Sequence, residues 1–350
     1  MPVRPGVGVS PEDSTSVVMQ IADIAGGPGR AVERAEALLD RLHRVVPFDA
    51  SFIALLHPER REHLPLVRSG YDERTRAFLD SPAWMDDIEA LGMQRERRPT
   101  RACDLTVPPE EVRCWAGYLV PAGFREGLGV GLFRPDGRYL GMLGMHTASP
   151  VPPTDDARDL IGMLAPLIAH AVDPMRSASA VAGVVHDAVA AVVVTRDATA
   201  LALPGLPAHR LLATGSAVLQ VVSERLAAGG VHAAFLCPDG DDGYLRVTVM
   251  SAPPEPPYHF AAVVTVSPAG DRQGLTHREL EVLGLLVEGW PNHAIALGLG
   301  ITDRTVAAHV EHVLTKLAVT SRTMAAVCAL RLGLFVPWLL HGARVADDEP

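Results

Sequence analysis

The sequence predicts a multidomain chain: two α+β domains with antiparallel sheets, followed by an all-α domain of four helices. At 350 residues the chain is long enough for two or three domains of roughly 150 residues each. Short apolar runs separated by turn signals recur between residues 29 and 268 and are typical of strands. From Leu275 onward the apolar residues instead follow helical spacing.

The composition fits a packed chain and excludes several kinds of chemistry. Hydrophobic residues make up 48% of the sequence and charged residues 21%, which argues against disorder over most of its length. Lys316 is the only lysine among 31 basic residues, a bias typical of a GC-rich bacterial genome. Because a P-loop and an aldimine enzyme each need a lysine, lysine-dependent nucleotide hydrolysis and pyridoxal chemistry are not expected.

No catalytic arrangement stands out, so we expect neither enzymatic activity nor a cofactor. Thr214-Gly215-Ser216 lacks the G-x-S-x-G elbow, and no paired carboxylates have a recognisable spacing. The four cysteines form no C-x-x-C pair, which disfavours a disulfide framework and a thiolate zinc site. The first 20 residues lack the apolar core of a signal peptide, and charges or proline interrupt the richest apolar stretches. We therefore expect a cytoplasmic protein with no membrane partner.

The first domain is expected over residues 29–175, after a loose N-terminal arm, residues 1–28, that is rich in Gly, Pro and Ser. A helical pattern runs from Ala31 to Val46. Strands are predicted at 51–56, 64–67, 128–133 and 139–146, and a Pro-Asp-Gly hairpin signal joins the last two. Thr154 is a capping residue for a closing helix that reaches Val172.

Three short phrases in this domain carry a family likeness: Phe48-Asp49-Ala50, Gly123-Phe124-Arg125 and the run from Pro135 to Gly141. With the order of helix, strands and closing helix, they resemble a GAF domain. Such a sensor domain implies a site for an unknown small-molecule ligand, and its candidate lining residues are Trp84, Trp115, Tyr118 and Phe124. Aromatic residues between a helix and a sheet are more often core, so packing is the favoured interpretation of these four.

A second α+β domain is expected over residues 180–268, after a break near Asp173-Pro174. Strands are predicted at 190–195, 232–236, 244–251 and 260–266, and a helix at 213–228. A small antiparallel sheet with helices on one side resembles a PAS domain, and the pattern also suits many other α+β modules. The acidic cluster Asp239, Asp241 and Asp242 could indicate calcium, but an Asp-Gly hairpin turn is favoured.

The C-terminal domain is expected over residues 272–337 and a tail over 338–350. Thr276 and Glu279 form a capping box that starts its first helix. Asn292 is expected to cap a short second helix and Gly300 to make the turn. Thr302 then caps a third helix, whose apolar stripe is Val306, Val310, Val313, Leu314 and Leu317. A helix that presents its outer face beyond a short supporting helix has helix-turn-helix geometry, in which the second helix enters the major groove of DNA.

Residues 275–322 also carry a specific pattern: Leu275-Thr276, Arg278-Glu279, Glu281-Val282-Leu283, Gly289, Asn292, Ile295-Ala296, Leu299, Ile301-Thr302, Thr305-Val306, His309, Lys316-Leu317 and Ser321-Arg322. This pattern resembles the LuxR/GerE-type DNA-binding domain. The resemblance implies a bacterial transcriptional regulator that binds double-stranded DNA, commonly as a homodimer. By motif position it implies a groove face of Ala307, Ala308 and Glu311, near the motif residue His309, and phosphate contacts from Arg304, Thr305, Lys316 and Arg322.

Two features weaken the expected attraction to DNA. The family often has lysine at the positions of Ala307 and Glu311, and the charges of residues 275–340 sum to zero. Because phosphate neutralisation supplies most non-specific affinity, we predict weak, dimer-dependent binding with a shallow salt dependence. Glu311 could accept a hydrogen bond from a cytosine amino group, but it equally repels phosphate. The alternative is a protein-interaction or ligand-sensing module whose helix-turn-helix no longer binds DNA strongly.

The remaining candidate residues have ordinary explanations. His309 and His312 lie three residues apart, but no Cys or acidic residue stands at a fitting spacing, so no metal site is predicted. Cys103 and Cys114 could sense oxidants, but free cysteines are usually buried small hydrophobes. The apolar tail residues Phe335, Trp338 and Leu339 are expected to pack within the chain or against a dimer partner.

Overall fold

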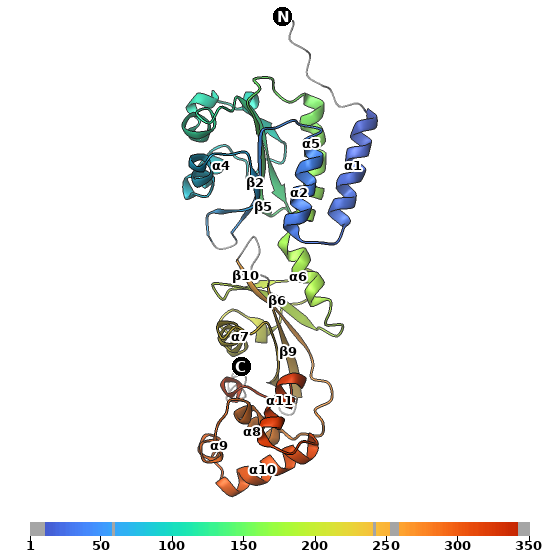
Figure 1. Cartoon of the computed structure of the whole chain (residues 1–350), viewed down its shortest axis with the longest axis vertical. Coiled ribbons are helices and arrows are strands. Elements are labelled where there is room, and N and C mark those ends of the chain that lie inside the picture. Colours follow the sequence, from blue (N-terminus) through green and yellow to red (C-terminus); the bar gives the residue numbers. More distant parts are fainter. Residues whose placement is uncertain (1–10, 58–59, 241–242, 253–258, 342–350) are drawn as a thin grey trace, which may run out of the picture. The chain divides into compact units, whose positions relative to one another are not determined.

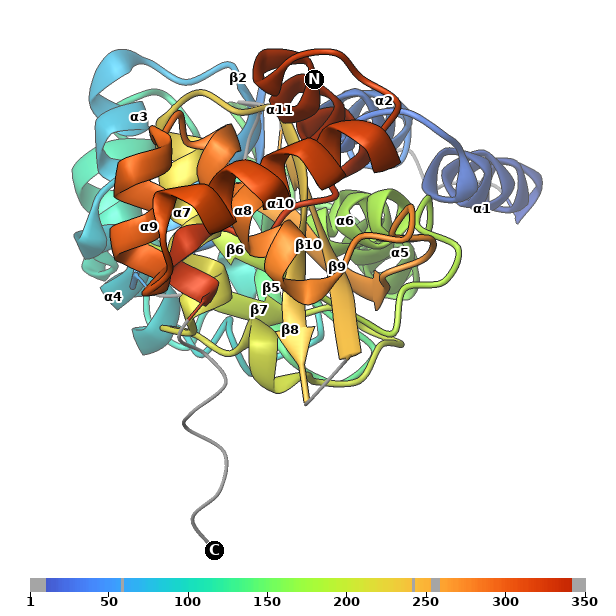
Figure 2. The same cartoon turned by 90° about the horizontal axis from the view of Figure 1, so that it is seen from below.

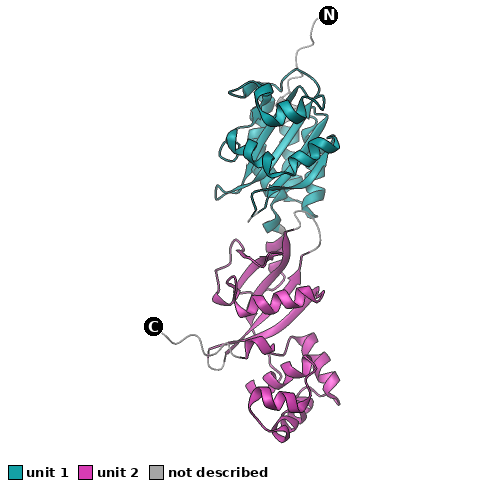
Figure 3. Cartoon of the chain, turned by 90° about the vertical axis from the view of Figure 1, so that its left-hand side faces the viewer, with its two compact units in different colours: residues 1–177 teal, residues 178–350 magenta. Residues whose placement is uncertain are grey.

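The computed structural model of the chain describes residues 11–57, 60–240, 243–252 and 259–341. The chain divides into two compact units, residues 1–177 and 178–350 (Figure 3). The predicted fold class is confirmed, since each unit contains a five-stranded antiparallel sheet with helices and the second unit ends in an all-α domain. No helix among the described residues is both long and apolar enough to cross a bilayer.

The first unit is built on a sheet with the strand order β2-β1-β5-β4-β3, of which β2 and β5 are labelled in Figure 1. Its strands are β1 (Ala50–Leu56), β2 (His63–Ser69), β3 (Thr100–Arg101), β4 (Glu126–Phe133) and β5 (Tyr139–Thr147). β4 and β5 pair as the predicted hairpin, with Val130 opposite Leu143. Side chains of β1 alternate between the two faces, so that Ile53 belongs to one buried cluster and Phe52 to the other.

Helices cover both faces of this sheet (Figure 1). The helices α1 (Pro11–Gly26), α2 (Ala31–Leu42) and α5 (Asp155–Val172) contribute to the same buried cluster as Ile53. The opposite face is covered by α3 (Glu73–Leu79), α4 (Pro82–Ala90) and a π-helical turn (Trp115–Leu119), around Phe52 and Trp84. A short helix, α6 (Pro174–Ala182), follows α5.

The prediction of a loose arm over residues 1–28 is wrong for residues 11–26. Pro11–Gly26 forms α1, and its Val17, Ile21 and Ala25 are buried in the cluster shared with α2 and α5. Their spacing of four residues places them on one face of the helix, and burying that face offsets the entropic cost of ordering the segment. The Arg176 guanidinium also donates to the carbonyl oxygens of Gly26 and Gly27, at 2.9 and 3.0 Å.

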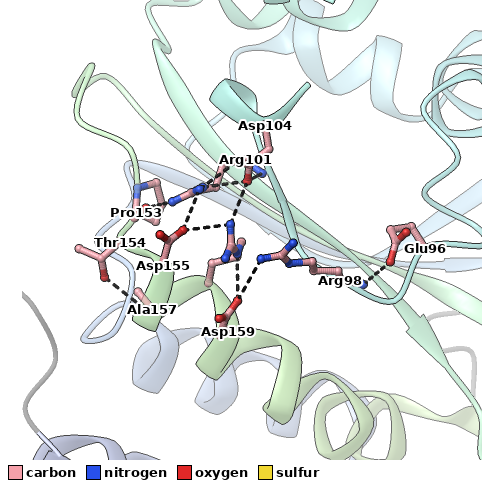
Figure 4. Close-up of polar contacts among 10 residues, drawn as sticks. Glu96, Arg98, Arg101, Asp104, Pro153, Thr154, Asp155, Ala157 and Asp159 are labelled. Carbon is pink, nitrogen blue, oxygen red and sulfur yellow. Dashed lines mark hydrogen bonds and ion pairs between the residues drawn. The ribbon is translucent and has the colours of Figure 1, made fainter. Parts of the chain in front are cut away.

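An ion-pair network holds the short edge strand β3 to the start of α5 (Figure 4). Arg101 donates to the Asp104 carboxylate at 2.8 Å and to the Pro153 carbonyl oxygen at 2.7 Å. Asp155 lies 3.0 Å from both Arg101 and Arg158. The hydrogen bonds from Arg101 lower the pKa of Asp104 to about 2. Because the cations and carboxylates of this network pair with each other, we assign it a structural role.

The second unit contains a sheet with the same strand arrangement. Its order is β7-β6-β10-β9-β8, so both sheets read 2-1-5-4-3 when strands are counted from the first of each sheet. The strands are β6 (Ala190–Thr195), β7 (Ala200–Ala202), β8 (His232–Asp239), β9 (Gly243–Ser251) and β10 (Phe260–Pro268). The helix α7 (Ala217–Ala227) buries Val218 and Val222 in the cluster formed with this sheet. Of the predicted acidic cluster, Asp239 closes the β8–β9 ladder opposite Gly243, while Asp241 and Asp242 lie outside the described residues.

The helical domain shares one apolar core with this second sheet. Its helices are α8 (His277–Val287), α9 (Asn292–Leu299), α10 (Asp303–Lys316) and α11 (Arg322–Leu332). Phe235 of β8, Leu283 of α8 and Phe335 after α11 belong to the same buried cluster. At the edge of the sheet, the Leu236 N–H donates to the Phe335 carbonyl oxygen at 2.8 Å. Of the tail residues, Phe335 is therefore packed within the chain, whereas Leu339 is 43% exposed.

Candidate nucleic-acid interface

The first helix of the C-terminal domain starts at the predicted capping box. The Thr276 hydroxyl accepts from the Glu279 backbone N–H at 3.3 Å, and the Glu279 carboxylate accepts from the Thr276 N–H at 2.8 Å. Both backbone donors at the start of α8 are thereby satisfied, as the capping-box pattern requires. This prediction is confirmed.

The turn between α9 and α10 also follows from local chemistry. Gly300 ends α9 in the left-handed conformation, with φ 62° and ψ 36°. The Thr302 hydroxyl caps α10 by accepting from the Thr305 backbone N–H at 3.2 Å. One detail of the prediction is wrong: Asn292 is the first residue of α9, and its cap position is taken by Pro291, which has no side-chain acceptor. A proline suits the cap because it has no N–H to leave unpaired.

The two faces of α10 differ sharply. Val306 and Val313 are completely buried, and Val310, Leu314 and Leu317 pack partly buried against the same core. Away from this buried stripe, α10 is exposed at six of the predicted DNA-contacting positions: Arg304, Thr305, Ala307, Ala308, Glu311 and Lys316. His309 is half-buried at the boundary between the two faces. Within the second unit, α10 lies on the side of the helical domain remote from the sheet (Figures 1 and 2).

Lys316 lies at the end of α10 and is engaged inside the domain. Its ammonium is 2.7 Å from Oε2 of Glu279 and donates to the Gly274 carbonyl oxygen at 2.9 Å. The Glu279 side chain is only 4% exposed. Burial raises the pKa of Glu279, but the hydrogen bonds from Lys316 and Thr276 outweigh that effect and leave the pKa below its ordinary value. Lys316 therefore fixes α10 to α8.

Arg322 and Arg278 also bind carbonyl groups within the domain. The Arg322 guanidinium donates to the Trp290 carbonyl oxygen at 2.5 Å, which joins the start of α11 to the segment between α8 and α9. Arg278 donates to the Leu299 carbonyl oxygen at 2.7 Å and to the Glu281 carboxylate at 2.9 Å. By contrast, Arg304 makes no hydrogen bond or ion pair with any residue that the structure describes. Arg304 is thus the basic residue of α10 that can turn to another molecule.

Comparison with known sequences decides what this helical domain is. Residues 273–329 match the family described as "Bacterial regulatory proteins, luxR family". They form a LuxR-family helix-turn-helix domain. The LuxR-type domain is 48% identical over 62 residues to the transcriptional regulatory protein LnrK of Bacillus subtilis, covering 18% of this chain and 28% of LnrK. It is 47% identical over 57 residues to the nitrate/nitrite response regulator protein NarL of Escherichia coli, covering 16% of this chain and 26% of NarL.

Two solved structures with some similarity to this chain are a whole protein and an isolated domain. Escherichia coli SdiA covers 92% of this chain and 98% of its own, with 14% identity and a TM-score of 0.32. The GAF domain of a phosphoenolpyruvate-protein phosphotransferase from Coxiella burnetii covers 48% of this chain and 98% of its own, with 13% identity and a TM-score of 0.36. The match to LnrK and NarL spans only about a quarter of the length of either relative.

The four aromatic residues proposed as ligand contacts lie on one face of the first sheet, but they do not line one site. Trp84 and Trp115 line a cavity of about 40 Å³, together with His146 and Met142. Tyr118 instead stacks on Phe78, with ring centroids 3.9 Å apart. Phe124 packs edge-on against Tyr71 at 5.7 Å. Their packing supports the core interpretation favoured from the sequence.

Two titratable groups near this cavity are held neutral by burial. His146 is surrounded by aromatic rings, and its Nδ1 is 2.6 Å from the Tyr71 hydroxyl. Burial lowers the pKa of His146 to about 3. Burial also raises the pKa of the Cys114 thiol to about 12, so it is not a reactive thiolate at neutral pH. Cys103 is an exposed residue, but partial desolvation of its thiol still raises its pKa.

Proposed function

We propose that this protein is a transcriptional regulator that binds double-stranded DNA as a homodimer, with the outer face of α10 in the major groove. The residues proposed to contact DNA are Arg304, Thr305, Ala307, Ala308, His309 and Glu311. Arg304 and Thr305 lie in the first turn of α10, where the positive end of the helix dipole favours phosphate. Lys316 and Arg322, predicted as phosphate contacts, have partners inside the domain and are proposed to position the helices.

The observation that carries this proposal is the exposed face of α10. Val306 and Val313 fix the rotation of the helix, so its opposite side is presented to solvent. None of the described residues covers that side although the domain packs on the second sheet, because the sheet contacts the start of α8, the end of α11 and the segment after α11 instead. A recognition helix needs this arrangement, with a supporting helix behind it and base-contacting side chains in front.

The charge of the domain sets the expected affinity. The salt-dependent part of DNA binding comes from phosphates that the protein neutralises. The logarithm of the association constant falls with the logarithm of the salt concentration with a slope of about −0.9 per phosphate. With Arg304 as the basic residue available on each α10, we expect a slope of about −2 for a dimer. Non-specific binding by one subunit alone is then weak, and specificity depends on two half-sites bound together.

The proposal is tested by DNA binding of the full chain. A duplex selected from a random-sequence library is titrated by fluorescence anisotropy at several salt concentrations. Arg304→Ala is expected to lower affinity and reduce the magnitude of the salt slope by about 1 for each subunit. Arg44→Ala is the matched control, because it removes the same charge from an exposed position just after α2 in the first unit. It is expected to change neither the affinity nor the salt slope.

The alternative function is a module that binds another protein through the same helices. The formal neutrality of residues 275–340 favours it over a strongly basic DNA-binding surface. The experiment separates the two, because an anisotropy titration that is identical for the parent and Arg304→Ala contradicts phosphate contact and supports the alternative.

We further propose that the first domain acts as a sensor that changes the dimerisation or the pose of α10. A ligand achieves this only if it binds one arrangement of the protein better than the other. The cavity beside Trp84 and Trp115, about 40 Å³, is far smaller than the roughly 300–1,000 Å³ of ordinary small-molecule sites. The proposed ligand therefore selects a more open arrangement of this domain, which predicts that DNA affinity differs with and without a small-molecule extract of the host cells.

A further inference from the structure

A carboxylate and two imidazoles converge between α8 and α10. Glu279 lies in the first turn of α8, and His309 and His312 lie one turn apart on α10. One ligand atom from each of these three side chains lies within 4.8 Å of the other two. The sequence prediction found no acidic partner for the histidines, because Glu279 stands 30 positions before His309 and only the fold brings it there.

The two oxygens of Glu279 have different partners. Oε2 accepts from the Thr276 N–H at 2.8 Å and from the Lys316 ammonium at 2.7 Å. Oε1 instead faces His312, whose Nδ1 is 3.7 Å away. A cation could therefore bind Oε1 and the imidazoles while Lys316 and the capping box keep Oε2. The carboxylate is also held in place by those bonds, which reduces the entropic cost of using it as a ligand.

This ligand set selects a particular class of cation. Two imidazoles and one carboxylate suit zinc and related transition metals, whereas calcium and magnesium prefer oxygen ligands. The three ligand atoms now lie up to 4.8 Å apart, and metal–ligand distances of about 2.0–2.2 Å require them to move closer together. The side chain of His312 is 63% exposed and His309 is half-buried, so both rings have room to turn inward.

We propose that Glu279, His309 and His312 form a binding site for a divalent transition-metal ion such as Zn²⁺. The ion binds through three protein ligands and keeps open positions for water or another donor. It ties the middle of α10 to the start of α8 and adds positive charge to a domain whose formal charge is zero. The nearby Lys316 ammonium opposes the added charge, so the expected dissociation constant is micromolar, well above that of a structural zinc site.

The site is tested on the full chain, prepared without a polyhistidine tag and freed of metal by a chelator. Zinc affinity is measured by competition with a chromophoric chelator. We expect a micromolar site that is weakened at least tenfold by His309→Ala and by His312→Ala. His293→Ala, which removes an exposed histidine from α9 of the same domain, is the matched control and is expected to leave this site unchanged. Equal zinc affinity in the parent and both α10 variants would overturn the proposal.

A second measurement needs no variant. Diethylpyrocarbonate modifies free imidazoles, and trypsin cleavage after Arg304 and Lys316 releases a peptide, residues 305–316, that contains both proposed histidine ligands. Zinc is expected to slow modification of this peptide at least several-fold, and to leave the rate at His293 unchanged. Modification of residues 305–316 at the same rate with and without 100 µM zinc, a concentration of about 100 times the expected dissociation constant, contradicts the site.

Discussion

Lys316 offers the sharpest distinction between a positioning role and a DNA contact. Replacing Lys316 with Ala removes the ammonium that lies 2.7 Å from the buried carboxylate of Glu279. A hydrogen bond to a charged group contributes about 1.5–3 kcal/mol, and the 32% exposure of the Lys316 side chain places this one toward the middle of that range. We therefore expect the free energy of unfolding of the second unit to fall by about 2 kcal/mol, and its Tm by about 4–8 °C.

The assay is urea unfolding of the full chain at pH 7, followed by circular dichroism, together with DNA binding at several salt concentrations. A double-mutant cycle with Glu279→Gln isolates the pair, because Lys316→Ala is expected to cost much less once the carboxylate is neutral. The pKa of Glu279 is lowered in the folded state, so this stabilisation is present above its ordinary pKa of 4.5 and is lost as the pH falls through the folded value. The difference between the parent and Lys316→Ala is accordingly expected to shrink below pH 4.5.

A DNA-contact role for Lys316 predicts the reverse pattern. The salt slope would then fall by about 1 per subunit while stability changed by less than about 0.5 kcal/mol. That outcome would refute the positioning role. A loss of stability with an unchanged salt slope at concentrations where the variant stays folded agrees with it.

Two further predictions concern the interior of each unit. The pKa of His146 is lowered to about 3 in the folded chain, so as the pH falls below about 6.5 the His146 imidazole becomes protonated in the unfolded chain first. The free energy of unfolding of the first unit is therefore expected to fall by about 1.4 kcal/mol per pH unit because of this group. In His146→Gln that pH dependence between pH 6 and 4 is expected to weaken, as measured by urea unfolding at each pH, and an unchanged profile would exclude His146 as its source. On α8, a Cβ at Gly284 would collide with the backbone carbonyl oxygen of Val336, so Gly284→Ala is expected to lower the free energy of unfolding by about 2–4 kcal/mol. A Tm equal to that of the parent would show that the segment after α11 moves aside.

The parts of the interface that depend on nearby residues could be predicted from the sequence. The Thr276 capping box, the Gly300 turn and the Thr302 cap each depend on a few consecutive residues, and all three are present. The outer face of α10 followed from the period of its apolar residues. Helix α1 was missed because the prediction for residues 1–28 rested on their Gly, Pro and Ser content and not on the spacing of Val17, Ile21 and Ala25.

The contacts between distant residues could not be predicted in this way. The salt bridge between Lys316 and Glu279 joins positions 37 residues apart, and the phosphate role predicted for Lys316 depended on its position in a motif. Likewise, the convergence of Glu279 with His309 and His312 depends on how α10 packs across α8. The two sheets share one strand order, which is set by the hydrogen bonds between their strands. No similarity between the two stretches of sequence indicated this order.

The bond between the Leu236 N–H and the Phe335 carbonyl oxygen occupies part of the outer edge of the second sheet. An edge strand left bare can recruit strands from other molecules, so detaching the helical domain would create a surface prone to aggregation. Because this bond lies within the second unit, any change that keeps the helical domain docked leaves that edge covered.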